Sequence, residues 1–518
     1  MTSQTALDSP NVFDAGLPSI AYDHLTDPEE AHRVLADARN HAPIAISPHG
    51  PHVLRYDLVR RVLRDDRFIT AHGLGLDAQG VTSGPLWDRA TSNILSLDGA
   101  AHHRLRRLVS KAFAPRAAER LRSLAVEIIR GLVEPFTAVG HCDVVTDIAR
   151  GYPTPVICAL LGAPPEDWQL FSDWVDDIKK LFEWNVVNDA PLILAAWNEL
   201  DAYLEDLITQ RRASLTDDLI SDLIRAEDDG DRLTHDELLM LCATLLGAGT
   251  DTTRNQLAAA VQVLAAHPDQ WNLVARHPDL APDAVHELMR YNPIIFGTIR
   301  RAAEDIELAG VHIPAGTLVA ANTASANRDP DAYRDPERLD ITRGSPPAIL
   351  NFGGGVHYCL GSHLARLELT EALRVITKLM PNPRQTGLAP WKGMAGITGP
   401  ITLPLEFDVG HEISPLTRAS VTSVTQASRQ AGGQFARLRA TPEFVARSRA
   451  HWTLPAPVTR VADVTIVSKF PLRGANALTW PGVTARVAGC LASTVIDGDR
   501  LKVAILAVPR FTQERHHG

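Results

Sequence analysis

The sequence predicts a mainly α-helical fold with small β-sheets, followed by a C-terminal extension of uncertain order. Three observations lead to this prediction. Apolar residues recur three and four positions apart through most of 28–270, two short stretches show the alternation of strands instead, and the charge balance changes sign near residue 409. The 518 residues are 45% apolar and 22% charged, which is typical of a folded protein with a large core.

The helical periodicity is clearest in three segments: 117–132, 192–208 and 238–264. A strand begins at His52 and passes directly into a helix, and a second extended stretch covers 306–319 with a turn at Pro314-Ala315-Gly316. Residues 327–347 are dense in Asp, Arg and Pro, which leaves few uninterrupted helical positions. We predict an ordered loop there.

The N-terminal residues 1–19 contain polar and acidic groups where a secretory signal would need a basic start and an apolar run, so we expect a flexible N-terminus and a cytoplasmic protein. No stretch has eighteen successive apolar residues, so the sequence predicts no membrane span. The net charge of −10 argues against broad binding of nucleic acid.

The C-terminal segment 409–518 carries 14 Lys or Arg against 6 Asp or Glu, whereas the preceding residues carry a net charge of −18. This change marks a domain boundary. The segment contains no redox motif and no recognised domain, although 495–499 is typical of a hairpin. We therefore predict a basic extension, disordered or weakly ordered, that is not a fused reductase.

The five cysteines are far apart and odd in number, which fits neither a disulfide framework nor a zinc cluster. Four of them are expected to be small buried residues: Cys142, Cys158, Cys242 and Cys490. Cys359 differs because it lies in 352–361, FGGGVHYCLG, just before a periodic helix that begins near 362. Free amides and the dipole of a helix N-terminus favour a thiolate there.

A second constellation, Gly247-Ala-Gly-Thr-Asp-Thr-Thr253, lies in a long predicted helix. Small residues allow helices to pack closely and threonine can bond back to a carbonyl one turn earlier, so a purely structural interpretation exists. An acid beside an alcohol can also relay protons. The sequence around these residues leaves both interpretations open.

The loop 352–361 resembles the haem-ligand signature of cytochromes P450, Phe-Gly-x-Gly-x-His-x-Cys-x-Gly, with every fixed position present. The resemblance implies a cytochrome P450 fold over 20–408, with heme b (iron protoporphyrin IX) as the cofactor and Cys359 as the axial thiolate ligand of the iron. Phe352 and Gly353 would lie beside the sulfur. Residues 247–253 resemble the P450 oxygen-binding motif, which implies proton-relay roles for Asp251 and Thr252.

The resemblance also assigns the pair Glu287 and Arg290, which precedes Asn292-Pro293. Glu-x-x-Arg occurs elsewhere in this chain as ordinary ion pairing, so the pattern alone means little. In the family the pair joins an arginine, here Arg338, in a structural triad. Two haem propionates need cations or strong donors, and four residues match the family's positions for them: His102, Arg106, Arg300 and His357.

The family's substrate contacts align with seven residues, mostly apolar: Leu245, Ala248, Ile294, Ile295, Phe296, Thr298 and Ile397. They imply a lipophilic small-molecule substrate. The chain lacks flavin, dinucleotide and iron–sulfur motifs, so we expect electrons from a separate ferredoxin and ferredoxin reductase. A basic run would suit an acidic ferredoxin: Arg104, Arg106, Arg107 and Lys111.

The reaction implied is monooxygenation, in which one atom of O2 enters a C–H bond or an alkene, and we expect the enzyme to be a monomer. Two alternatives remain open. A peroxide-driven P450 needs no proton relay, and a non-catalytic haem sensor likewise needs none, so Asp251 and Thr252 favour the enzyme that uses O2.

Overall fold

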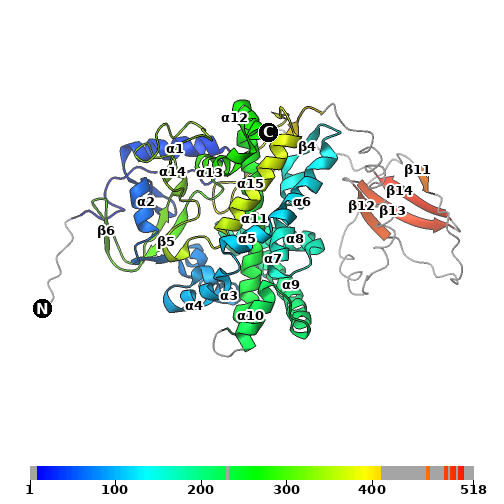
Figure 1. Ribbon diagram of the computed structural model, residues 1–518. Coiled ribbons are helices and arrows are strands. Elements are labelled where there is room, and N and C mark those ends of the chain that lie inside the picture. Colours follow the sequence, from blue (N-terminus) through cyan, green and yellow to red (C-terminus); the bar gives the residue numbers. More distant parts are fainter. Residues whose placement is uncertain are drawn as a thin grey trace, which may run out of the picture. The chain divides into compact units, whose positions relative to one another are not determined.

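The computed structural model describes residues 9–228 and 233–409, together with strands within 463–506. The chain divides into two compact units, residues 1–413 and 414–518, which are treated separately below. The first unit is mainly helical with small sheets, as predicted (Figure 1). No helix among the described residues is both long and apolar enough to cross a membrane.

The α-helices of the first unit follow one another over most of its length. In chain order they are α1 (Pro28–His41), α2 (Tyr56–Val62), α3 (Pro85–Ser92), α4 (Gly99–Ser110), α5 (Pro115–Arg120), α6 (Arg122–Val133), α7 (Pro153–Leu161), α8 (Trp168–Ile178), α9 (Val186–Ala213), α10 (Leu219–Asp228), α11 (His235–Ala265), α12 (Pro268–Arg276), α13 (Ala281–Tyr291), α14 (Thr323–Ala326) and α15 (Ser362–Leu379). Short helical turns include η5 (Val144–Ala149) and η7 (Lys179–Phe182).

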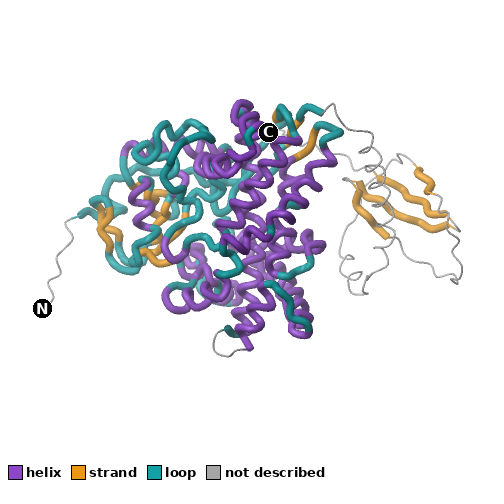
Figure 2. The backbone as a smooth tube through the Cα atoms, viewed as in Figure 1, coloured by secondary structure: helices purple, strands orange, loops and turns teal. Residues whose placement is uncertain are grey.

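The strands of this unit form three sheets. One has the order β1 (Ile44–Ser47), β2 (Gly50–Val53), β8 (Leu318–Ala321), β5 (Thr298–Ala302), β3 (Phe68–Thr70). The others are β4 (His141–Asp143), β10 (Pro404–Glu406), β9 (Arg384–Gln385), and the pair β6 (Ile306–Leu308), β7 (Val311–Ile313). Figure 2 shows most helices gathered in one layer and the sheet with the order β1-β2-β8-β5-β3 in a part richer in loops.

Helix α11 passes through the middle of the helical layer, with α15 beside it (Figure 1). It begins with a capping box, in which the Thr234 hydroxyl accepts from the amide of Glu237 and the Glu237 carboxylate accepts from the amide of Thr234. Packing against α7 is close, because a Cβ added at Gly249 would lie 2.7 Å from the Ile157 side chain. Gly249 therefore serves helix packing, which bears out the structural interpretation for this one residue.

The predicted extended stretches are present. Strand β2 ends at Val53 and α2 follows from Tyr56, while 306–319 contains β6, β7 and the start of β8. No helix or strand is assigned in 327–347, as expected of a loop. Strand β8 pairs in parallel with β2 and antiparallel with β5, and this pairing fixes the position of Arg300 on β5.

The N-terminal prediction is wrong for residues 9–19. Val12 is fully buried and its amide donates to the His312 carbonyl at 2.8 Å, while Ser19 forms a bridge with Ile46. These residues are packed because their backbone pairs with two strands and Val12 enters an apolar cluster. Residues 1–8 lie outside the described residues.

The second unit contains one antiparallel sheet among its described residues. Its order is β11 (Asp463–Ile466), β14 (Arg500–Leu506), β13 (Cys490–Asp497), β12 (Val483–Val487). Strands β13 and β14 pair from Leu491 with Leu506 to Asp497 with Arg500, which confirms the predicted hairpin strands. The extension thus carries more β-structure than the sequence led us to expect.

Candidate functional site

The loop that carries Cys359 is closed on itself. The Cys359 amide donates to the Phe352 carbonyl at 2.8 Å, and α15 begins three residues after the cysteine. Two glycines have positive φ angles, +70° at Gly353 and +64° at Gly355. A Cβ at Gly355 would lie 2.8 Å from the Leu63 carbonyl oxygen, so this glycine is required by the close approach of α2. The loop therefore places the thiol in front of a helix N-terminus.

The sulfur of Cys359 differs from the other described thiols. Burial raises the pKa of Cys142, Cys158 and Cys242 to about 12, which confirms them as inert core residues. Burial also raises the pKa of Cys359, but the Gly361 amide and the guanidinium groups of Arg106 and Arg366 act in the opposite direction. Its side chain is exposed at the inner end of the loop. The side chain of Cys490 lies outside the described residues.

The four predicted cation positions come together beside this loop. The rings of His102 and His357 have centroids 4.3 Å apart, and Arg106 donates to the Tyr358 carbonyl. Arg300 is buried and its Nη1 donates to the Ile299 carbonyl at 2.9 Å. Burial and neighbouring cations lower the pKa of His102 to about 4, so this histidine is neutral at pH 7.

One acid in this cluster was missed by sequence reasoning. Asp98 precedes α4, its Oδ1 lies 2.7 Å from His357 Nε2, and its Oδ2 accepts from the Thr70 amide at 2.8 Å. The carboxylate also favours the charged form of Arg300. Asp98 precedes His102 by one helical turn, and this spacing was the only signal in the sequence.

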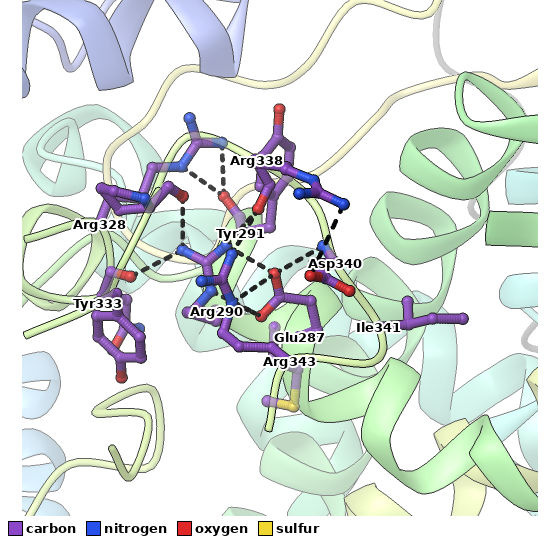
Figure 3. A network of polar contacts seen from close by, with 12 residues as sticks. Glu287, Arg290, Tyr291, Arg328, Tyr333, Arg338, Asp340, Ile341 and Arg343 are labelled. Carbon is purple, nitrogen blue, oxygen red and sulfur yellow. Dashed lines mark hydrogen bonds and ion pairs between the residues drawn. The ribbon is translucent and has the colours of Figure 1, made fainter. Parts of the chain in front are cut away.

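The Glu287–Arg290 pair is the centre of a saturated network (Figure 3). Arg290 donates from Nε and Nη2 to the two carboxylate oxygens of Glu287, each at 2.8 Å. Its remaining donors reach the carbonyls of Asn327, Pro336 and Arg338 at 3.0, 2.8 and 3.2 Å. The network ties α13 to the loop 327–347.

The third member of this network is Arg343, and the assignment of Arg338 is corrected. Arg343 Nε lies 3.2 Å from both oxygens of Glu287, and its side chain is 12% exposed. The Arg338 side chain is 69% exposed and pairs with Asp340 at 3.9 Å, so Arg338 contributes only its carbonyl (Figure 3). The backbone turns after Arg338 and directs the later arginine inward.

The opposite side of the site is formed by one face of α11. Ala248 is exposed in the middle of a helix that is otherwise largely buried, and Thr252 is half-buried one turn later. The Thr252 hydroxyl donates to the Ala248 carbonyl at 2.8 Å, as predicted for a threonine that bonds back within its helix. Asp251 is buried beside it, with 1% of its side chain exposed.

Asp251 belongs to a chain of charged groups that leads toward the surface. Its Oδ1 pairs with Arg254 and lies 3.6 Å from Lys179 Nζ, whereas Oδ2 is buried with no hydrogen-bond partner among the described residues. Lys179 and Arg254 both contact Asp176 Oδ1, at 2.6 and 2.7 Å. Arg150 Nη1 contacts Asp176 Oδ2 at 2.6 Å.

The exposed fraction of these side chains rises along the chain, from 1% at Asp251 to 13% at Lys179, 28% at Asp176 and 33% at Arg150. Burial alone would raise the pKa of Asp176, but Arg254 and Lys179 outweigh it and hold that pKa well below its usual range. Asp176 is therefore ionised at neutral pH.

Another buried acid lies next to these residues. Glu368 on α15 accepts from the Thr253 hydroxyl at 3.2 Å through Oε2, and its Oε1 has no partner in the described part of the chain. Burial raises the pKa of Glu368 well above its usual value. No sequence pattern indicates Glu368, because its position in α15 is that of an ordinary helical glutamate.

The sequence pattern of the family described as Cytochrome P450 matches residues 52–274 and 279–377, more than half of the chain. Luteothin monooxygenase from Streptomyces thioluteus is 38% identical over 382 residues, which are 72% of this chain and 92% of that protein. This chain belongs to the cytochrome P450 family.

Other relatives agree with that membership. Mycinamicin IV hydroxylase/epoxidase from Micromonospora griseorubida is 40% identical over 360 residues, 68% of this chain and 88% of that protein. The crystal structure of CalO2 aligns with a TM-score of 0.69 and 31% identity, over 74% of this chain and 97% of that one. The P450 is a monooxygenase, and its cofactor is haem, iron protoporphyrin IX.

The residues of this P450 fit that cofactor. Arg300 is a buried guanidinium whose one hydrogen bond among the described residues goes to its neighbour's carbonyl, and His102 Nδ1 is buried without a partner. Such donors suit the propionates of haem. Cys359 provides a soft ligand beside Arg106. Five side chains could therefore hold the group: His102, Arg106, Arg300, His357 and Cys359.

The predicted pocket residues divide into two sets. Ala248, Ile295, Thr298 and Ile397 are exposed or half-buried, and Leu245 is buried on the same helix as Ala248. Ile294 and Phe296 belong to the apolar cluster against α1, where the Phe296 ring lies 5.1 Å from that of His32 and 5.7 Å from that of Tyr22. Ile295 and Ile397 are partly buried and pack against the same cluster.

Proposed function

We propose that this monooxygenase inserts one atom of O2 into a lipophilic small molecule, using electrons from a separate ferredoxin and its reductase. The observation that carries the proposal is the position of Cys359, whose loop is closed by its own backbone hydrogen bond and lies beside the cluster of His102, Arg106 and His357. Haem with a thiolate ligand supplies the chemistry that activates O2. The residues of the chain bind it, orient the substrate and move protons.

Proton supply is the proposed role of Asp251 and Thr252. A hydroxyl can accept and donate a proton in one position, and the Thr252 hydroxyl lies on the open face of α11. The free Oδ2 of Asp251 can carry a proton, and the path through Lys179 and Asp176 leads toward solvent. A peroxide-driven enzyme would have no need of this path.

The substrate class follows from the open residues. Ala248, Ile295 and Ile397 present apolar side chains, and Thr298 presents one hydroxyl. Such a lining favours apolar molecules with few polar groups. Two relatives, a mycinamicin IV hydroxylase/epoxidase and a vitamin D(3) 25-hydroxylase, support hydroxylation or epoxidation as the reaction.

The proposed ferredoxin site is smaller than the basic run in the sequence. Arg104 makes a bidentate contact with Glu237, and Arg106 contacts the Tyr358 carbonyl. Arg107 on α4 and Lys111 directly after it are exposed and suit an acidic partner. We propose docking at these two residues, and we keep the expectation of a cytoplasmic monomer.

The test begins with the ferrous–CO spectrum of the full-length protein. A thiolate-type Soret band is expected, and it should be lost in Cys359→Ser. Lipophilic compounds are then screened for a spin-state shift, and those that bind are tested for product with NADPH, a surrogate ferredoxin and its reductase. Product with peroxide alone would favour the peroxide-driven enzyme, and binding without product under either condition would favour a sensor.

A further inference from the structure

A second lysine lies near Asp251 and has no role in the function proposed above. Lys392 lies on the segment 391–399, between β9 and β10, and is half-buried. Its Nζ is 3.3 Å from Asn255 Oδ1, and Asn255 Nδ2 donates to the Asp251 carbonyl at 2.7 Å. Lys392 thus reaches α11 one turn after the acid whose Oδ2 is unpaired.

The backbone of Lys392 is fixed, whereas its side chain has few bonds. The Lys392 amide donates to the Gly399 carbonyl at 3.1 Å, and the Lys392 carbonyl accepts from the Thr398 hydroxyl at 3.0 Å. Gly396 has a φ of +63° and lies so close to η7 that a Cβ there would be 2.6 Å from the Phe182 carbonyl oxygen. The segment holds the lysine stem in place while its long chain can rotate.

The charges around Asp251 do not balance when every group is ionised. The three carboxylates are Asp173 and Asp176 on α8, which both contact Arg150, and Asp251 on α11. The cations are Arg150 after η5, Lys179 on η7, Arg254 on α11 and Lys392. Excess positive charge in a partly desolvated cluster favours loss of one proton.

Among these cations, Lys392 is the group that loses a proton most easily. Arginine stays protonated in proteins, and Lys179 is held by Asp176 at 2.6 Å. Lys392 contacts an amide oxygen, and no carboxylate lies within ion-pair distance of it in the described part of the chain. Burial, with Lys179 and Arg254, lowers the pKa of Lys392 to about 8, although Asp251 opposes this change.

We propose that Lys392 is a positioning residue for Asp251: its amine stores a proton and, after the side chain rotates away from Asn255, passes that proton to the free Oδ2 of the acid. In the transfer an N–H bond of Lys392 breaks and an O–H bond forms on Asp251, which leaves a neutral amine that takes its next proton from water. The proposal rests on the proposed function, because it gives Asp251 the role of supplying protons to the reaction.

The first test measures the amine itself in the full-length holoprotein. Pulses of acetic anhydride from pH 6 to 10, followed by mass spectrometry of the peptides, give a titration midpoint for each lysine. The midpoint of Lys392 is expected near pH 8, below the ordinary range of lysine, and the exposed Lys378 serves as the control. Asp251→Asn should lower the Lys392 midpoint by about one further unit and leave Lys378 unchanged.

The second test measures O2 consumption driven by NADPH with surrogate ferredoxin and reductase, without added substrate. Lys392→Met should lower the rate about tenfold at pH 7.5, with partial recovery toward pH 6. The rate in Lys392→Arg should fall by a similar factor, because arginine keeps the positive charge but gives up no proton. Lys378→Met is the matched control and should behave as wild type.

Equal midpoints for Lys392 and Lys378, wild-type rates in Lys392→Met, or full rescue by Lys392→Arg would each overturn the proposal. Rescue by arginine would assign a purely electrostatic role. The thiolate CO band, measured in every variant, shows that the haem site is intact. Failure of wild type to consume O2 would contradict the proposed function, whereas the labelling result bears on Lys392 alone.

Discussion

Glu287–Arg290 and Asp251–Arg254 are two buried acid–arginine pairs with the same spacing on a helix, but they differ in how their oxygen atoms are bonded. Both oxygens of Glu287 accept from Arg290 and Arg343, and Oε1 also accepts from the Asp340 amide at 3.0 Å. Asp251 leaves Oδ2 buried and unpaired.

A saturated network has one low-energy arrangement and cannot release a proton without losing bonds. An acid with a free oxygen beside spare cations can change protonation at small cost. The difference indicates that the first pair holds the fold and that the second is suited to proton transfer. The variants described below test this difference between the two pairs.

The largest effect is expected from Glu287→Gln. The change leaves Arg290 and Arg343 buried without their carboxylate, so the free energy of unfolding should fall by about 3–5 kcal/mol. Urea unfolding and the haem content of purified protein measure the loss. The control is Glu134→Gln, in an exposed pair with Arg130, which should change stability by less than about 0.5 kcal/mol. A mild effect at Glu287 would contradict the structural role.

Asp251→Asn is expected to lower the reaction rate strongly and the stability only slightly. Without an exchangeable proton at this position, electron-driven O2 consumption is expected to fall about 100-fold. Stability should change by only about 1 kcal/mol, because Arg254 and Lys179 keep their contacts with Asp176. A thiolate CO band with normal haem content, measured beside the rate, separates loss of chemistry from loss of fold. A loss of folding that accompanies the loss of rate would contradict the proposed difference between the two pairs.

The identity of the third arginine is tested by a matched pair of variants. Arg343→Ala removes the Nε donor shared by both Glu287 oxygens and should cost about 2–3 kcal/mol. Arg338→Ala keeps the backbone carbonyl that Arg290 and Arg343 use, so its cost should stay within about 0.5 kcal/mol. Thermal unfolding of both variants measures these losses of stability. Equal losses would show that the Arg338 side chain also belongs to the network.

The smallest effect concerns Glu368, an acid with no ion pair among the described residues. Its folded-state pKa is raised by burial, so its protonated form is favoured in the fold. Stability is therefore fully present below the unfolded pKa and declines as pH rises above about 4.5. Glu368→Gln should flatten this decline and raise stability at pH 7.5 by about 1–2 kcal/mol. Urea midpoints from pH 5 to 8 measure it, and an unchanged slope would contradict the burial effect.

The sequence alone was enough to find the parts of the site that lie on short continuous motifs. The loop 352–361, the pair at 287 and 290, and the alcohol next to Asp251 could all be found because local geometry determines their contacts. Arg343 was missed because a side chain's direction in an irregular loop depends on where the backbone turns. The buried N-terminal residues were missed because nothing local shows that Val12 meets His312.

The partners of Asp251 could not be predicted for a related reason. Lys179, Asp176 and Lys392 come from segments far apart in the chain, and each looks like an ordinary surface residue in its own segment. Long-range packing brings them together, and the imbalance of charge exists only after folding. Asp98 is an intermediate case, since it lies one turn before a predicted site residue.

The parallel pairing of β2 with β8 has a consequence for how this protein folds. Val53 and Ala321 are neighbours in the sheet, although nearly the whole helical layer lies between them in the sequence. Such a contact has a high contact order, so it forms after the local helices. Arg300 lies on the adjacent strand and reaches its position only then. We therefore expect the helical layer to form before this strand pairing places Arg300 at the site.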